Sequence, residues 1–327
     1  MGKRKLYKFS GAGNDFVVLD GRRADVSAFR EPRRIGELCR EYRTDGLMIL
    51  GKAKGYDFAM EFYNPDGSGG MMCGNGGRCI VAFADYLGLK PAAADGVWRF
   101  LAPDGPHEAQ ILSGCEDTPS GGTQSLRSFG PSHCAVPSRA QAVGPSPYTC
   151  PGVDKPSGGS IPTTCKWTVR LKMIDVEGIK PMMGGYFLNT GTRHFVKFVR
   201  SVEAVDMEKD GPEYRWDDAF QPEGTNANFV EARPDGLHVR TFEKGVEAET
   251  LACGTGITAS AIAAFEAGIP GVDGASTGAE GCTSYRLQCL RGDWLQVDFK
   301  KDGGRFTNVY LTGPAELVRF TYLTNNE

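Results

Sequence analysis

Two cysteines occupy similar short motifs 180 residues apart. The first motif reads CGNGGRC from Cys73, and the second reads CGTG from Cys253. Each continues into an apolar segment of helical length that ends in Gly. The start of a helix offers free backbone N–H groups and the positive end of the helix dipole, which favour a bound anion and lower the pKa of a thiol. The motifs therefore predict two reactive thiols, each beside an anion-binding helix N-terminus.

Two such helix starts that face each other would hold one carboxylate between them, with one thiol on each side of the adjacent carbon. One thiolate then removes a proton from one face of the α-carbon, and the opposite thiol returns a proton to the other face. This geometry favours a two-base racemase or epimerase in which Cys73 and Cys253 exchange roles with the direction of reaction. No lysine lies in a context that indicates a Schiff base with pyridoxal phosphate, so we expect no cofactor. The carbanion would be stabilised electrostatically in a site without water.

Other functions for the cysteines are less well supported by spacing. Cys73 and Cys79 are further apart than the roughly two to four intervening residues of common zinc motifs, and the four histidines are scattered, so we expect no metal. Neither motif is Cys-x-x-Cys, although Cys73 and Cys253 could approach each other as a redox pair. We expect three other cysteines to be buried as small hydrophobic residues: Cys39, Cys79 and Cys289.

The motifs belong to a longer internal repeat. Phe16 in NDFVV lies 57 residues before Cys73, and Phe195 in RHFVK lies 58 residues before Cys253. The repeat predicts two domains of similar topology, related by an approximate twofold axis, each with one cysteine-led helix. Many strand-like runs with few helices indicate an α+β fold. Strands are expected at 5–11, 15–20, 97–103, 107–112, 167–176, 184–191, 194–199, 226–232, 237–243, 285–292, 293–300 and 308–313, and 56–68 is expected to carry a strand into a turn. Helices are expected at 31–43, after Cys79 and at 256–268.

One segment differs in composition from the rest. Of the 53 residues in 113–165, 25 are Gly, Pro or Ser. A segment of this composition buries too little apolar surface to offset the conformational entropy that is lost when the chain is ordered. We expect an insert there, between two strands, and a shorter one at 270–281. The four cysteines of the first insert are either reduced or joined as disulfides: Cys115, Cys134, Cys150 and Cys165. We place the N-terminal domain at 1–177, the C-terminal domain at 178–312, and a segment that returns to the first domain at 313–327.

Composition limits the partners. The net charge of −3 gives no basic field that would attract nucleic acid or an anionic membrane. No apolar run is long enough to span a bilayer, and the basic N-terminus lacks the apolar core of a signal peptide. We therefore expect a cytoplasmic protein with reduced thiols.

Five motifs, in order, resemble those of diaminopimelate epimerase: KFSGAGNDFVVLD, YNPDGSGGMMCGNGGRC, NTGTRHFV, GTNANFVE and FEKGVEAETLACGTG. The resemblance covers about 1–112 and 166–327. It implies two pseudo-twofold-related domains, each a mixed β-sheet wrapped around a central helix, and often a homodimer. It also implies cofactor-independent conversion of LL-2,6-diaminopimelate to the meso form, on the route to lysine and peptidoglycan.

The resemblance also assigns residues. Cys73 and Cys253 match the two acid/base thiols of the family. Glu243 matches an acid near the second thiol that contacts the substrate amine, and His194 matches a histidine that supports the thiols. The remaining matches are substrate-binding positions: Asn14, Asn64, Gly74, Asn75, Asn226, Lys244, Gly254 and Thr255. Other interpretations stay open, namely turn chemistry for Asn64, a solvated charge for Glu243 and a structural role for His194.

Several positions depart from the family. Lys244 stands in place of an arginine and keeps the charge without the bidentate fork. Thr192 and Arg193 replace Asn-Pro, Gly46 replaces a glutamine, and one extra residue precedes Cys253. These changes concern the distal end of the substrate. The alternatives are therefore a proline or hydroxyproline racemase, a non-catalytic carboxylate-binding homologue, and a redox-regulated scaffold that uses the cysteines of the insert.

Overall fold

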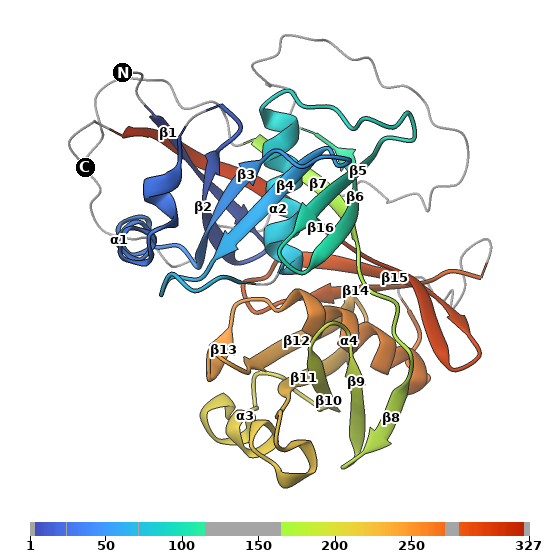
Figure 1. The fold of residues 1–327 in the computed structure, drawn as a ribbon. Coiled ribbons are helices and arrows are strands. Elements are labelled where there is room, and N and C mark those ends of the chain that lie inside the picture. The colour runs from blue at the N-terminus through green and yellow to red at the C-terminus, as the bar shows by residue number, and fades with distance from the viewer. Residues whose placement is uncertain (1–3, 24, 71, 115–164, 272–280, 324–327) are drawn as a thin grey trace.

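The computed structural model describes residues 4–23, 25–70, 72–114, 165–271 and 281–323. Two halves are visible in Figure 1, each with one helix surrounded by strands, and they meet along one long strand. The elements of the N-terminal half are β1 (Arg4–Gly11), β2 (Asn14–Asp20), η1 (Ser27–Arg30), α1 (Pro32–Tyr42), β3 (Gly46–Gly51), β4 (Phe58–Tyr63), α2 (Gly74–Tyr86), β5 (Val97–Ala102), β6 (Gly105–Ser113) and β7 (Cys165–Lys172). The remaining elements are β8 (Ile179–Met182), β9 (Gly185–Asn189), β10 (Arg193–Phe198), α3 (Met207–Arg215), η2 (Asp218–Phe220), β11 (Asn226–Arg233), β12 (Gly236–Glu243), β13 (Ala248–Thr250), α4 (Gly254–Glu266), β14 (Thr283–Gln288), β15 (Trp294–Asp302) and β16 (Arg305–Leu323).

The strands form one continuous sheet. Its order is β1-β2-β3-β4-β5-β6-β7-β16-β15-β14-β12-β11-β10-β9-β8, with β13 paired to β12. An additional β1–β16 pairing closes the N-terminal half around α2. Strand β16 serves both halves, because Thr312 pairs with Gln296 of β15 and the next residue, Gly313, pairs with Val169 of β7. Strand β16 therefore passes from the C-terminal half to the N-terminal half at residues 312–313.

The two halves repeat the same pairing pattern. In the N-terminal half β1–β2 is antiparallel, β2–β3 is parallel across α1, and β3–β4 is antiparallel. In the C-terminal half β9–β10, β10–β11 across α3, and β11–β12 follow the same sequence of directions. The predicted α+β fold, with two related domains that each wrap a mixed sheet around a central helix, is confirmed. The domain boundaries at 177/178 and 312/313 stay a prediction.

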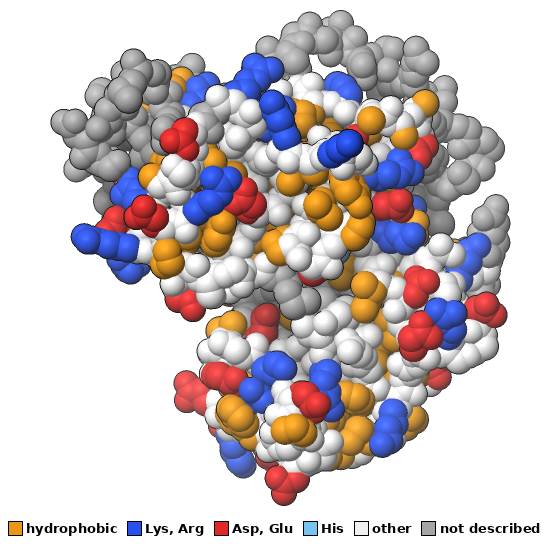
Figure 2. All heavy atoms as spheres, viewed as in Figure 1, with side chains coloured by type: hydrophobic (Ala, Val, Ile, Leu, Met, Phe, Trp, Pro, Cys, Tyr) orange, Lys and Arg blue, Asp and Glu red, His pale blue; other side chains and the backbone are white. Residues whose placement is uncertain are grey.

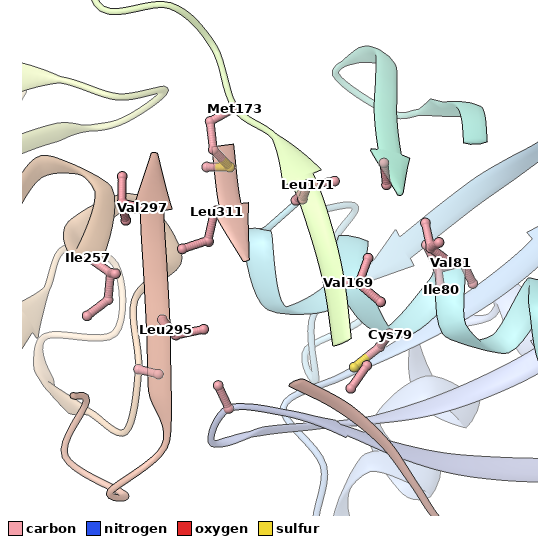
Figure 3. Packing of buried hydrophobic residues seen from close by; sticks show 14 of the residues in the cluster. Cys79, Ile80, Val81, Val169, Leu171, Met173, Ile257, Leu295, Val297 and Leu311 are labelled. Carbon is pink, nitrogen blue, oxygen red and sulfur yellow. The ribbon is translucent and has the colours of Figure 1, made fainter. Parts of the chain in front are cut away.

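The central helices are buried on all sides. Helix α2 buries twelve of its thirteen residues, and α4 is lined by alanines and other small residues that allow strands to approach closely. Figure 3 shows Val169 and Leu171 of β7 on the side of α2, and Val297 of β15 on the side of Ile257 in α4. Such helices hold their N-termini in fixed positions, because sliding either one would disturb packing all around it.

Several element predictions were wrong or incomplete. The helix expected after Cys79 begins at Gly74 and includes Cys79, which is fully buried. The helix expected from 256 begins at Gly254. Sequence analysis missed β3, β8, β13 and α3, and it found only 308–313 of the 19-residue β16. Helix α3 was not predicted because it contains Gly211 and Pro212, both poor helix formers.

The predicted inserts fall almost entirely outside the described residues. Strand β6 ends at Ser113 and β7 begins at Cys165, which agrees with a strand-to-strand connection between them. Cys165 is disulfide-bonded, so the reduced alternative is wrong for this cysteine. The other three cysteines of that segment lie outside the described residues.

Candidate active site

The N-termini of α2 and α4 meet head to head. Cys73 is the N-cap residue of α2 and Cys253 is the N-cap residue of α4. The first residues of the two helices, Gly74 and Gly254, are so close that a Cβ placed on Gly254 would lie 3.3 Å from the Cα of Gly74. The Cδ2 atom of Leu311 in β16 lies beneath both, 2.9 and 3.2 Å from the corresponding Cβ positions. A side chain at Gly254 would therefore press on the start of α2, whereas one at Gly74 would mainly displace Leu311.

This meeting point lies between the two halves of the molecule. The surface in Figure 2 is notched on its left side where the halves meet, below the N-terminal half and above the C-terminal half. Lysine and arginine side chains are interspersed with acidic ones on this face, and neither sign dominates. Two positive helix ends at one point would favour a bound anion there, on a surface that is otherwise mixed in charge.

Cys73 receives hydrogen bonds from the start of its own helix. The backbone N–H of Gly76 donates to Cys73 Sγ at 3.2 Å. Burial raises the pKa of Cys73, as does the charge of Glu243, whereas the helix N–H groups and Arg78 lower it. The expectation that the helix start leaves the thiol pKa low is therefore wrong in net sign, because the loss of water outweighs the dipole.

Cys253 has a different partner. Its Sγ lies 3.4 Å from the hydroxyl of Thr255, and the thiol is buried. Burial again raises the pKa, followed by the negative charge of Glu243, while the Thr255 hydroxyl and the N–H of Gly256 lower it. Both thiols are consequently protonated at neutral pH without a ligand. A negative charge on either sulfur depends on the few donors that point at it.

His194 is buried in a network of polar side chains that leads to Cys253. Its Nδ1 lies 3.1 Å from Nδ2 of Asn228, and the same amide group donates to Phe195 O at 3.0 Å while its Oδ1 accepts from Thr241. These bonds fix Asn228 Nδ2 as the donor, so His194 Nδ1 accepts and the ring proton is on Nε2. Burial lowers the pKa of His194 to about 3, so the ring is neutral.

The Nε2–H group of His194 faces two threonine hydroxyls. The oxygen of Thr192 lies 2.9 Å away and that of Thr255 lies 3.0 Å away, and the two oxygens are 3.2 Å apart. Asn226 Nδ2 also donates to the Thr192 hydroxyl, at 3.2 Å. With donors on both hydroxyls, the remaining hydrogen of Thr192 can point at Thr255, and that of Thr255 at Cys253 Sγ. The network is therefore oriented toward the sulfur.

On the side of α2, Asn75 connects the two halves. Its Nδ2 donates to Asn14 Oδ1 at 2.5 Å and to the carbonyl of Ala252 at 3.3 Å. Asn14 begins β2, and Ala252 immediately precedes Cys253. The predicted residues Asn14 and Asn75 thus lie together, beside both helix starts.

Asn226 and Lys244 also lie together. Parallel pairing of β10 and β11 places Asn226 opposite His194, and the backbone N–H of Lys244 donates to Asn226 Oδ1 at 2.7 Å. The Lys244 ammonium is exposed and donates to Glu223 O at 2.9 Å. Glu243, the last residue of β12, accepts a 2.9 Å hydrogen bond from Thr250. Burial raises the pKa of Glu243 and Asp45 raises it further, so this carboxyl is not a freely solvated charge.

Two positions are less integrated. Asn64 Nδ2 donates to Ser68 Oγ at 3.0 Å within its own turn, which is the turn chemistry considered from the sequence. A Cβ on Gly46, the position of the family glutamine, would lie 2.8 Å from Phe62 Cε2 and from Tyr63 O. A larger residue at 46 would therefore require β4 to shift, and the departure has a packing cause.

Sequence reasoning missed four residues that the structure brings to the site: Asn228, Thr241, Arg78 and Leu311. Asn228 was within reach, because Asn226 and Asn228 in TNANF alternate along a strand and share one face. The others depend on contacts between distant elements. Among the described residues, no group of three His, Cys, Asp or Glu side chains is placed to hold a metal ion.

Comparison with known proteins identifies the family. The model of the family described as diaminopimelate epimerase matches residues 6–97 and 186–318. The chain belongs to the diaminopimelate epimerase family. A curated diaminopimelate epimerase from Flavobacterium psychrophilum is 32% identical over 318 residues, which cover 96% of this chain and 98% of that protein. The prediction that the protein is an isomerase of the epimerase and racemase type is confirmed.

Solved structures support the fold alone. A phenazine biosynthesis protein of the PhzF family from Bacillus anthracis superposes with a TM-score of 0.62 at 11% identity, covering 99% of this chain and all of that one. A probable proline racemase from Agrobacterium radiobacter K84 superposes with a TM-score of 0.58 at 14% identity, covering 99% of this chain and 93% of that one. No helix in the described part of the chain is long and apolar enough to cross a membrane.

Proposed function

We propose that this chain converts LL-2,6-diaminopimelate to the meso isomer by a cofactor-independent, two-base mechanism. The observation that carries the proposal is the head-to-head meeting of α2 and α4, each capped by a cysteine, with 3.3 Å between the Cβ position of Gly254 and the Cα of Gly74. Membership of the diaminopimelate epimerase family supports the choice of substrate.

The reacting α-carboxylate binds where the two helix starts meet. The N–H groups at the two helix starts, those of Gly74 and Asn75 on one side and of Gly254 and Thr255 on the other, converge there. A carboxylate held between them places its α-carbon between Cys73 and Cys253. The carboxylate also accepts part of the negative charge when the α-proton leaves, so the same N–H groups stabilise the carbanion.

One cysteine acts as the base and the other as the acid. One thiol first releases its proton to solvent, and its thiolate takes the α-proton. The thiol of the other cysteine protonates the opposite face and is left as the thiolate, so the two protonation states are exchanged. Both roles are needed because the configuration inverts. The Thr255 hydroxyl stabilises negative charge on Cys253, and the Gly76 N–H does so on Cys73. His194 orients the Thr255 hydroxyl, and Glu243 receives the substrate amine.

The distal end of the substrate carries a second amino-acid head and requires polar partners. Asn14, Asn64, Asn226 and Lys244 are the proposed partners, and Asn226 and Lys244 are already joined by a hydrogen bond. We also propose the domain boundaries 1–177, 178–312 and 313–327, a homodimeric assembly and a cytoplasmic location. The pairing of β16 with β15 before residue 313 and with β7 from that residue on supports the last boundary.

The test is an epimerisation assay with LL-diaminopimelate, a thiol reductant and no added pyridoxal phosphate, with the isomers separated by chiral chromatography. We expect conversion to the meso form by the wild-type chain, and none by Cys73→Ala or Cys253→Ala. Ser260→Ala is the matched control, because it removes a buried hydroxyl from α4 whose partner among the described residues is Gly256 O of the same helix. Well-folded, reduced wild-type protein that leaves LL-diaminopimelate unchanged would refute the proposal. Proline and hydroxyproline would then be tested, since the probable proline racemase has a similar fold.

A further inference from the structure

Arg78 lies one turn inside α2 and is fully buried, with 0% of its surface exposed. Its guanidinium donates to three acceptors: Gly74 O at 3.1 Å, Asn75 Oδ1 at 2.8 Å and Pro314 O at 3.3 Å. All three acceptors are neutral. Among the described residues no carboxylate forms an ion pair with it. The site therefore contains a buried positive charge that has no directly paired carboxylate among the described residues, although Asp293 acts on it from a distance.

Such an arrangement is uncommon, because a buried charge is costly unless an opposite charge or a metal accompanies it. Arg215 is the comparable buried arginine of the C-terminal half, and it is paired with Glu247 at 2.9 Å. If Arg78 served only to tie α2 to β16, a neutral donor would do so without that cost. The lack of a directly paired carboxylate indicates that the anion that pairs with this charge is not part of the resting protein.

The contacts of Arg78 show where that anion belongs. The carbonyl that accepts from Nη1 belongs to the peptide unit between Gly74 and Asn75, and the other end of this unit is the Asn75 N–H at the helix start. A donor on the carbonyl polarises the peptide and strengthens its N–H as a donor. Nη2 also holds the Asn75 side chain, which bridges to Asn14 and Ala252. Arg78 thus acts on the anion site through the Gly74–Asn75 peptide and the Asn75 side chain.

We propose that Arg78 is a positioning residue of the site, whose buried charge acts through the Gly74–Asn75 peptide to stabilise negative charge on Cys73 Sγ and on the substrate carboxylate. The carboxylate part rests on the proposed function, whereas the thiolate part does not. Gly313 allows this placement, since a Cβ there would lie 3.2 Å from Arg78 Nε.

Other charged and titratable groups act on the same atoms. The Cys73 thiol is faced by Glu243 of β12, which opposes ionisation, and it lies near Cys253 of α4. Arg78 is faced by Cys73 and Cys79 of its own helix, and by Cys289 and Asp293 in the connection between β14 and β15. Glu243 raises the pKa of Cys73 and Arg78 lowers it. The neutral variant of Arg78 is therefore compared with the variant that keeps the charge, and Glu243 is left unchanged in both.

The experiment separates charge from hydrogen bonding. Arg78→Gln keeps an amide donor and removes the charge, and Arg78→Lys keeps the charge and removes the fork. Each is made in a Cys253→Ser background and treated with iodoacetamide over a range of pH, and alkylation of the Cys73 peptide is followed by mass spectrometry. Arg215→Gln is the matched control for loss of a buried arginine. Thermal unfolding confirms that each variant is folded.

We expect Arg78→Gln to shift half-maximal alkylation upward by about one pH unit, which is about a tenfold loss of thiolate at a given pH. Arg78→Lys should shift it much less, and Arg215→Gln not at all. Equal shifts in the Gln and Lys variants would overturn the proposal, because they would reveal a purely structural role. An unshifted profile in folded Arg78→Gln would overturn it as well.

A second measurement addresses the carboxylate. In turnover of LL-diaminopimelate, Arg78→Gln should raise KM and lower kcat, each several-fold, and Arg78→Lys should mainly raise KM. Unchanged KM in both variants would refute the carboxylate part. If wild-type protein does not turn over this substrate, the proposed function fails, and the alkylation profile still decides the thiolate part.

Discussion

Replacing Thr255 with valine removes the side-chain hydroxyl that lies beside Cys253 Sγ and keeps the β-branched shape. In the structure the hydroxyl lies 3.4 Å from Cys253 Sγ and 3.0 Å from His194 Nε2. After the change, His194 retains Thr192 as an acceptor at 2.9 Å, so no buried donor is left without a partner. The effect should therefore come from the sulfur alone.

The size of the effect follows from the charge on the sulfur. A hydrogen bond to a charged group contributes roughly 1.5–3 kcal/mol, and each 1.36 kcal/mol corresponds to about a tenfold change in rate. We expect kcat/KM to fall roughly 10- to 100-fold in Thr255→Val. The fall must be equal in the LL-to-meso and meso-to-LL directions, because the enzyme does not change the equilibrium between the isomers.

The assay compares Thr255→Val with Thr255→Ser, which restores the hydroxyl without the methyl group. Initial rates in both directions and the pH profile of Cys253 alkylation are measured for each. We expect the alkylation profile to move to higher pH in the valine variant, since the hydroxyl lowers the pKa of Cys253. If the serine variant is as impaired as the valine variant, or if Thr255→Val stays within threefold of wild type, the reasoning about this hydrogen bond is refuted.

Three further changes have expected outcomes. Glu243→Gln removes a negative charge that raises the pKa of both thiols, so alkylation should shift to lower pH, while Glu243→Asp leaves it nearly unchanged; a shift to higher pH would contradict this. Burial lowers the pKa of His194 from 6.5 to about 3, so between these two pH values the imidazole is protonated in the unfolded chain and neutral in the folded one. The free energy of unfolding therefore falls as the pH drops below 6.5. The drop in Tm from pH 7 to pH 5 should shrink in His194→Gln, and an unchanged drop would contradict the assignment of a neutral ring. Gly254→Ala should impair activity more than Gly74→Ala, because its Cβ meets backbone at 3.3 Å whereas that of Gly74 meets the flexible end of Leu311. Leu311→Val should accordingly rescue Gly74→Ala and not Gly254→Ala, as assayed by kcat/KM.

Most residues of the candidate site were predicted from local sequence. The cysteines were placed beside helix N-termini because Gly-rich starts followed by apolar runs are local signals, and the repeat around Phe16 and Phe195 predicted the two-domain fold. The register of β10 and β11, which places His194 opposite Asn226, follows once both strands are known. Asn228 could have been predicted as well, because it follows Asn226 by two residues and therefore lies on the same face of β11.

Other features depend on contacts that no local pattern encodes. Leu311 lies beneath both helix starts because β16 crosses from one half to the other, and Arg78 bonds Pro314 at 236 residues of separation. The net direction of the thiol pKa also required the structure. The helix N-terminus lowers it and burial raises it, and only the packed site shows that burial is the larger effect.

The most direct test of the two-base account follows solvent deuterium during early turnover of LL-diaminopimelate in D2O by ¹H NMR. If the opposite thiol returns the proton, the meso product carries deuterium at the inverted α-carbon from the first turnover, while the remaining LL substrate keeps its α-protons. Both Cys73→Ala and Cys253→Ala should abolish formation of the deuterated product. Product that retains the substrate's own α-hydrogen, or conversion that survives the loss of either cysteine, would contradict the account.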